Sequence, residues 1–155
     1  LAIFIILFSP GVPMLSAGQD FMRNKEGVRN TYKRGDLNVL RYEDLNYYSE
    51  LNLGVRQMIK FRLSEDGVFL RPQKMGDCSY HVCEGFSEGT IGLEIEDNRK
   101  HKSFLLVINF VSQNRTVLYP GKWLGSRCFL SEIQARSNAV FPPYSYAVFG
   151  LKEES

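Results

Sequence analysis

The sequence predicts an α+β chain in which one β/α unit is followed by an antiparallel β-sandwich. The first 64 residues read as helix, buried strand, long loop and helix, which is the order of a closing β/α unit of an α/β fold. After Gly67, short strand-like runs alternate with turn residues, and no comparable helical run reappears. Apolar residues make up 44% of the chain and charged residues 23%, which is the balance of a folded globular protein.

The chain begins with an apolar helix and an apolar strand. Residues 1–9 are almost uniformly apolar, which predicts the last turns of a helix packed against a sheet, and Pro10 and Gly11 end it. Residues 12–17 form a second apolar run that ends at Gly18. A parallel strand that is buried on both faces has this pattern, so we expect a buried strand at 12–17.

The apolar start also imitates a signal peptide, because small residues follow it. No initiating Met and no basic residues precede it, and it is shorter than the roughly 20 residues that span a bilayer. We therefore interpret the chain as truncated and expect no membrane segment.

A long loop and a second helix complete the first half. Residues 18–45 are rich in charged residues, Asn and Gly and show little periodicity, which predicts an irregular connection; loops this long are usually functional or disordered. Apolar residues then recur at helical spacing from Leu51 to Leu63 and predict an amphipathic helix over 48–63.

The second half contains only short runs typical of strands, separated by turns such as 97–100 and 112–115. This pattern of short strands and turns predicts an antiparallel meander or sandwich over residues 65–155, with 1–64 as a separate unit. The expected strands are at residues 68–70, 79–83, 90–96, 104–110, 116–119, 127–130 and 144–151.

Charge and cysteine content exclude some classes of function. A net charge of +2 is too small for nucleic-acid binding, which depends on a dense Lys and Arg surface. Three cysteines cannot form a complete set of disulfides within the chain, so both a secreted and a cytoplasmic location stay open.

One motif resembles a known family. Residues 11–21, Gly-Val-Pro-Met-Leu-Ser-Ala-Gly-Gln-Asp-Phe, resemble the segment that forms the eighth barrel strand of α-amylase-superfamily enzymes. The continuation is similar to the loop of pullulanases and related debranching enzymes, with Phe-Met-Arg at 21–23, Asn-x-Tyr at 30–32 and Gly-Asp-x-Asn at 35–38. Residues 105–110 and 141–149 are similar to strands of the C-terminal sandwich of that superfamily.

This resemblance implies a fold and an activity. Residues 1–64 would be the last β/α unit of a (β/α)8 catalytic barrel, and 65–155 the C-terminal sandwich. The intact enzyme would cleave α-1,6 bonds of starch, glycogen or pullulan by a retaining mechanism, which needs two carboxyl groups about 5 Å apart. In the family these carboxylates lie on earlier strands, upstream of Leu1, so we expect no catalytic residue here and no activity from this chain alone.

The same resemblance implies a role in holding the substrate. Because active sites of such barrels lie at the carboxyl ends of the strands, the long loop is the expected position of sugar contacts. The predicted binding residues near the donor-side glucose subsites are Asn30, Tyr32 and Arg34. The predicted supporting residues of the loop are Gln19, Asp20 and Arg23. Asp20 stands where the family more often has Glu. The alternative for all six is that they form salt bridges and caps within the loop.

The partners expected from the resemblance are an α-glucan and the missing N-terminal part of the barrel. No cofactor is expected, and the use of calcium by the intact enzyme stays open. Without the rest of the barrel, the apolar faces of 1–17 and of the 48–63 helix must pack on the sandwich or lie exposed.

Two other groups of residues deserve a second interpretation. Cys78, His81 and Cys83, with Cys128 and His101, contain zinc-ligand chemistry, but their spacing fits structural zinc sites poorly, and we interpret the cysteines as core residues. The aromatic residues Tyr119, Trp123 and Tyr144 would either form a platform for glucose rings or fill the sandwich core.

Two alternative functions are left open. An α-1,4-acting amylase shares the barrel and the sandwich, and only the Asn-x-Tyr and Gly-Asp-x-Asn loop favours a debranching enzyme. A secreted β-sandwich module for carbohydrate binding or protein interaction, with a signal peptide at 1–18, would leave the loop motif and the 48–63 helix unexplained.

Overall fold

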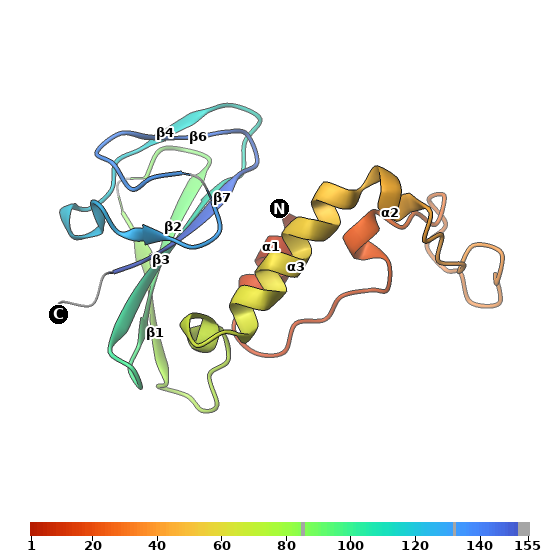
Figure 1. Cartoon of the computed structure of the whole chain (residues 1–155), viewed down its shortest axis with the longest axis horizontal. Helices are drawn as coiled ribbons and strands as arrows, with labels where there is room; N and C mark the ends of the chain where they lie inside the picture. The colour runs from red at the N-terminus through yellow and green to blue at the C-terminus, as the bar shows by residue number, and fades with distance from the viewer. Residues whose placement is uncertain (85, 132, 152–155) are drawn as a thin grey trace.

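The computed structural model describes residues 1–84, 86–131 and 133–151 and contains a helical part and an all-β part. The main helices are α1 (Ala2–Phe8) and α3 (Ser49–Leu63), which lie side by side next to the sheet (Figure 1). The connection between them carries the 3-10 turn η1 (Gln19–Phe21) and the single-turn helix α2 (Asp44–Tyr47). The part of this connection that carries η1 and α2 lies at the end of the molecule away from the sheet (Figure 1).

Both predicted helices are confirmed, and their ends are set by hydroxyl groups. The hydroxyl of Ser9 donates to the carbonyl of Ile5 at 2.6 Å and ends α1 just before Pro10. The hydroxyl of Ser64 donates to the carbonyl of Phe61 at 2.7 Å and accepts from the backbone N–H of Gly67 at 3.2 Å. These bonds satisfy groups that a helix leaves unpaired at its end.

A five-stranded antiparallel sheet has the strand order β1-β2-β3-β7-β5, and β4 pairs with β6 in a second, two-stranded sheet. The fold class is therefore α+β with an antiparallel sheet. The strands are β1 (Cys78–Cys83), β2 (Thr90–Asp97), β3 (Lys102–Asn109), β4 (Arg115–Val117), β5 (Arg127–Cys128), β6 (Ala139–Phe141) and β7 (Tyr146–Gly150).

The central strand β3 of the large sheet is buried on both faces, whereas most of the edge strand β1 is exposed. Successive side chains of a strand point to opposite faces of the sheet. On β3, Phe104 and Leu106 pack with α1 and α3, whereas Leu105 and Val107 pack with the second sheet and Trp123. The aromatic rings of Phe4 and Tyr146 stack at 4.0 Å and join α1 to β7. Part of the apolar surface of the two helices thus packs on the sheet. This is one of the two outcomes expected from the sequence, the other being exposure to solvent.

Most expected strands are present, with two differences. Residues 68–70, predicted as a strand, belong instead to the 3-10 helix η2 (Asp66–Leu70). Gly67 packs so closely on the end of α3 that a Cβ atom there would lie 2.1 Å from the carbonyl oxygen of Phe61, which leaves the chain turning tightly rather than extended. Strand β6 was not predicted, because three residues between turns give too short an apolar pattern.

The buried strand predicted at residues 12–17 is wrong for this chain. The segment is irregular, and no strand pairs with it in the part of the chain that the structure describes. Val12 is 92% exposed and Met14 is 85% exposed. A parallel strand needs neighbouring strands for its hydrogen bonds and for its burial, and the described residues provide none beside this segment.

Among the described residues, none of the helices combines the length and the apolar character that a bilayer-crossing helix needs.

Candidate functional site

Gln19 and Asp20, two of the residues predicted to support the long loop, form hydrogen bonds at its base. The side-chain oxygen of Gln19 accepts from the backbone N–H of Ser16 at 2.7 Å. The carboxylate of Asp20 accepts from the side-chain amide of Asn52 on α3 at 2.7 Å, which ties the start of the loop to this helix. Gly18 has a φ of +85°, and a Cβ atom there would lie 2.7 Å from the Cβ of Arg23, so this turn requires glycine.

A hydrogen-bond network centred on Asn38 closes the loop. Its side-chain oxygen accepts from Arg23 at 3.2 Å and from the hydroxyl of Thr31 at 2.9 Å, and its amide donates to the Thr31 carbonyl at 2.8 Å. Arg23 also donates to the carbonyl of Ala17 at 3.4 Å. The sequence motif contained Asn38, but nothing in its spacing showed that Asn38 links Arg23 to the buried Thr31.

The three predicted sugar-binding residues lie on the exposed part of the loop. The side-chain oxygen of Asn30 accepts from the backbone N–H of Tyr32 at 3.0 Å, and Tyr32 is 80% exposed. The ammonium group of Lys33 lies 5.8 Å from the centre of this ring. Asn30 and Tyr32 are thus neighbours through a local turn, and the phenol is available to a ligand.

Arg34 is engaged with a neighbouring carboxylate. Its guanidinium forms three hydrogen bonds with Asp36: Nε to Oδ1 at 2.9 Å, Nε to Oδ2 at 3.3 Å and Nη2 to Oδ2 at 2.7 Å. This pairing raises the pKa of Arg34 and lowers the pKa of Asp36. The cavities described in this chain do not have Asn30, Tyr32 or Arg34 in their walls. The sugar-binding roles of these three residues therefore stay predictions.

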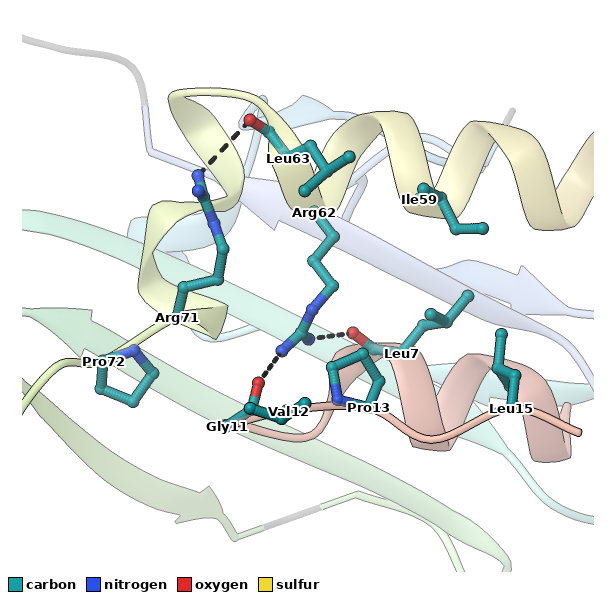
Figure 2. A pocket seen from close by; sticks show the side chains of 10 residues that line it. All are labelled: Leu7, Gly11, Val12, Pro13, Leu15, Ile59, Arg62, Leu63, Arg71 and Pro72. Carbon is teal, nitrogen blue, oxygen red and sulfur yellow. Dashed lines mark hydrogen bonds between the residues drawn. The ribbon is translucent and has the colours of Figure 1, made fainter.

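An apolar cavity of about 520 Å³ lies between the 12–15 segment and α3 (Figure 2). Val12, Pro13 and Leu15 form one side, and Ile59 and Leu63 of α3 form another. These apolar walls are suited to packing against other apolar side chains rather than to binding a polar substrate.

Arg62 lies at the wall of this cavity and is only 4% exposed. Its guanidinium donates to four backbone carbonyls, those of Leu7, Ser9, Gly11 and Leu70 (Figure 2 shows the bonds to Leu7 and Gly11). Burial, and to a lesser extent the charge of Arg71, lower the pKa of Arg62. Sequence reasoning missed Arg62, because all four of these partners are backbone carbonyls, which leave no pattern in the side-chain sequence.

The cysteine-rich stretch does not form a metal centre. Within residues 1–84, 86–131 and 133–151, no group of three or more His, Cys, Asp or Glu side chains could hold a metal ion. All three cysteines are free thiols, and burial raises the pKa of Cys78 and of Cys83.

The aromatic platform considered for the sandwich is contradicted. Trp123 is fully buried and Tyr119 is 7% exposed in the core between the two sheets, whereas Tyr144 is 57% exposed. These rings therefore share no open face.

Comparisons with known proteins agree with the sequence motif, although no family model matches the chain. Pullulanase of Bacillus subtilis (strain 168) is 32% identical over 99 residues, which are 63% of this chain and 14% of that protein. The chain resembles the C-terminal part of a pullulanase-type enzyme of the α-amylase superfamily. The predicted resemblance to this kind of enzyme is thus confirmed for the chain.

Solved structures share the fold of this pullulanase-like chain. The crystal structure of a pullulanase complexed with maltotetraose from Anoxybacillus sp. LM18-11 matches with a TM-score of 0.76 at 20% identity, covering 97% of this chain and 22% of that one. A mutant of MUTB from crystals soaked with trehalulose matches with a TM-score of 0.61 at 11% identity, covering 97% of this chain and 37% of that one. The pullulanase-like chain thus spans well under half the length of each of these relatives.

Proposed function

We propose that this chain is the closing part of a starch-debranching glycoside hydrolase. In this proposal residues 1–64 are the end of the (β/α)8 catalytic barrel and 65–155 are its C-terminal sandwich. The observation that carries the proposal is the 32% identity to a pullulanase over 99 residues.

The uncovered surface around residues 12–17 supports a barrel-end role. Val12 and Met14 are exposed, and Ile59 and Leu63 of α3 are 36% and 65% exposed. A barrel strand is flanked by two other strands and covered by helices, which would bury these side chains. The segment that is irregular here would then be the eighth strand of the complete barrel.

The reaction proposed for the complete enzyme is retaining hydrolysis of α-1,6 bonds. One carboxylate attacks the anomeric carbon while a carboxylic acid protonates the leaving oxygen, and water later releases the sugar. Both groups, and a third carboxylate beside them, are placed upstream of Leu1. The part played by this chain is to position the glucan, with Asn30, Tyr32 and Arg34 offering an amide, an exposed phenol and a guanidinium to sugar hydroxyls.

The test uses the complete protein that contains this chain, assayed on pullulan and on amylose. Asn30→Ala, Tyr32→Ala and Arg34→Ala are each expected to raise KM for pullulan about tenfold, the effect of about 1.4 kcal/mol of lost binding. Arg29→Ala is the matched control in the same loop and should leave KM unchanged.

Two results would contradict this proposal. Hydrolysis of amylose without cleavage of the α-1,6 bonds of pullulan would favour the α-1,4-acting alternative. Release of sugar by the isolated 155-residue chain would show that the catalytic groups lie within it.

A further inference from the structure

Strand β1 forms a free edge of the large sheet. It pairs with β2 on one side, and no strand among the described residues pairs with its other side. Its sequence, Cys-Ser-Tyr-His-Val-Cys at 78–83, contains no Lys, Arg, Asp, Glu, Pro or Gly, and its register with β2 is continuous, without a bulge. Natural proteins commonly use charges, Pro or bulges to keep an edge strand from pairing with another chain. Strand β1 has none of these devices.

The register of the sheet shows which backbone groups of β1 face the free edge. In an antiparallel pair, residues that bond to the partner alternate with residues whose N–H and C=O point away from it. The backbone N–H of Asn98 donates to the carbonyl of Asp77, directly opposite, at 2.9 Å. Counting along β1 from Asp77, the N–H and C=O groups of Cys78, Tyr80 and Val82 therefore point outward.

The pairing of β2 with β3 gives the same assignment. The backbone N–H of Phe110 donates to the carbonyl of Gly89 at 2.9 Å, so the odd-numbered residues of β2 bond to β3. The even-numbered residues of β2 bond to β1, and the register places them opposite the odd-numbered residues of β1. The even-numbered residues of β1 are thus left without a partner strand.

The side chains along this edge are open to a partner as well. Tyr80 is 45% exposed and Val82 is 64% exposed, and both lie on the same face of the sheet because they are two residues apart. Ser79 and His81 are exposed on the opposite face. Aromatic and β-branched residues are the types that form favourable pairs across neighbouring strands.

The pattern of outward groups fits a second copy of the same strand in antiparallel orientation. Two residues can exchange hydrogen bonds across an edge only if the backbone groups of both point outward. A twofold axis at Tyr80 meets this condition, because it places Tyr80 opposite Tyr80 of the second copy and Cys78 of each copy opposite Val82 of the other. This pairing would form about six new hydrogen bonds.

Charge and space also favour a second copy over a segment of another protein. Strand β1 has no charged side chain at pH 7 that would select an acidic or a basic segment, and pairing with its own copy brings no like charges together within the strand. In this register the hydroxyl of Ser79 lies opposite the imidazole of His81, and the two can share a hydrogen bond. Beyond the strand, Glu84 would lie opposite Gly76, which has open space where a side chain would be.

We propose that β1 is a dimerisation edge, at which two copies of this chain join their five-stranded sheets into one continuous sheet. Such a contact uses the same surface of both copies and closes on itself. An edge contact is smaller than the roughly 1,200–2,000 Å² buried in stable interfaces, so the dimer is weak and reversible. The inference uses only the geometry of the sheet and does not rest on the proposed function.

The test is sedimentation velocity of the 155-residue chain over a range of concentrations, combined with hydrogen exchange followed by NMR. The fraction of dimer should rise with concentration. The backbone amides of Tyr80 and Val82 should become protected together with it, because they bond only to the second copy. The amides of Ser79 and His81 should be protected at every concentration, because they bond to β2.

Two variants address the edge itself. Val82→Pro removes an outward N–H and no hydrogen bond to β2, which an edge strand tolerates, and it should weaken dimerisation about tenfold or more. Tyr80→Lys places like charges directly opposite each other and should weaken it to a similar extent. The matched control is Tyr47→Lys on α2, where the tyrosine is 82% exposed, and it should leave dimerisation unchanged. Protected amides at residues 79 and 81 show in each variant that β1 still pairs with β2.

Several outcomes would overturn the proposal. A chain that stays monomeric at every concentration would do so, as would an equal weakening by Tyr47→Lys. Dimerisation without protection of the Tyr80 and Val82 amides would assign the contact to another surface, such as the apolar one around residues 12–15. Protection of these two amides that does not depend on concentration, in this chain or in the complete protein, would show that a different segment occupies the edge.

Discussion

Arg62 is a buried cation whose hydrogen-bond acceptors are all backbone carbonyls. Three of them belong to Leu7, Ser9 and Gly11 at and beyond the end of α1, and the fourth belongs to Leu70 of η2. The last carbonyls of a helix lack partners within it, and a guanidinium has enough donors to serve several at once. Arg62 therefore fixes the start of the 12–17 segment to the connection that enters the sheet.

Replacing Arg62 tests this role. Arg62→Met keeps much of the volume but removes every donor, and leaving buried carbonyls unpaired costs about 1–3 kcal/mol for each group. We expect a loss of about 3 kcal/mol in the free energy of unfolding, measured with urea. Arg62→Lys should lose less, because an ammonium group still donates to some of these carbonyls.

The control for Arg62 is Arg56, which is exposed on the same helix. Arg56→Met should change stability by less than about 0.5 kcal/mol, as surface substitutions usually do. Equal effects of the two variants would show that the carbonyl bonds of Arg62 contribute little.

The predicted site residues show what sequence can and cannot establish at this scale. The family motif indicated a polar loop, and the local bonds of Asn30 and of Gln19 are the kind that such residues form. Asn52, the partner of Asp20, is 32 residues away, and three of the four partners of Arg62 are 51 to 55 residues away. Bonds to the backbone leave no pattern in side-chain chemistry, so Arg62 could not be selected from the sequence.

At the scale of elements, an ion cluster joins the connection between η2 and β1 to the β2–β3 turn. Arg99 pairs with Asp97 at 2.9 Å and with Asp77 at 3.5 Å, and both carboxylates are almost completely buried. Backbone N–H groups of Gln73 and Lys74 and the charge of Arg99 overcome burial and lower the pKa of Asp77. Burial acts to raise the pKa of Asp97, but the hydrogen bonds from Arg99 outweigh it, and the net shift is downward.

These shifts predict an acid-sensitive fold. A carboxyl group with a pKa lower in the folded than in the unfolded chain stabilises the fold above its unfolded pKa of about 4, and this stability is lost as the pH falls through the folded value. The free energy of unfolding should therefore decrease as the pH falls from about 5 to about 2, across the unfolded pKa of about 4.

Arg99→Gln tests the source of this pH dependence. The variant should be clearly less stable than the parent chain at pH 7, with the difference shrinking at low pH, where both carboxyls are protonated. Arg34→Gln, which breaks the exposed pair with Asp36, is the control and should change stability little at either pH. A constant difference between parent and Arg99→Gln across the pH range would contradict this assignment.

The elements themselves were predictable where their pattern was long. The helix at 48–63 and the strands around 90–96 and 104–110 have enough residues for a clear period, and the structure contains all three. Residues 68–70 were too few to distinguish a strand from a 3-10 turn. The apolar character of residues 12–17 is evident from the sequence. Whether such a segment forms a strand depends on the strands that lie beside it, and these cannot be predicted from the segment itself.

At the scale of the whole molecule, the all-β part has a core of its own, whereas the helical part leaves large apolar side chains exposed. The sandwich has its own core between two sheets, built around Trp123, Phe141 and Phe149. The helical part covers one face of the large sheet but leaves Val12, Met14 and the outer side of α3 exposed. This asymmetry is what the end of a larger catalytic barrel would show when it stands without the rest.

Hydrogen exchange at the backbone amides of Val12, Met14 and Leu15 tests this central claim most directly. In the 155-residue chain these amides should exchange rapidly, because the segment is exposed and unpaired with any strand that the structure describes. In the complete protein they should be strongly protected, since strands on both sides would bond to them. Rapid exchange of the same amides in the complete, active protein would contradict the assignment of residues 12–17 as a barrel strand.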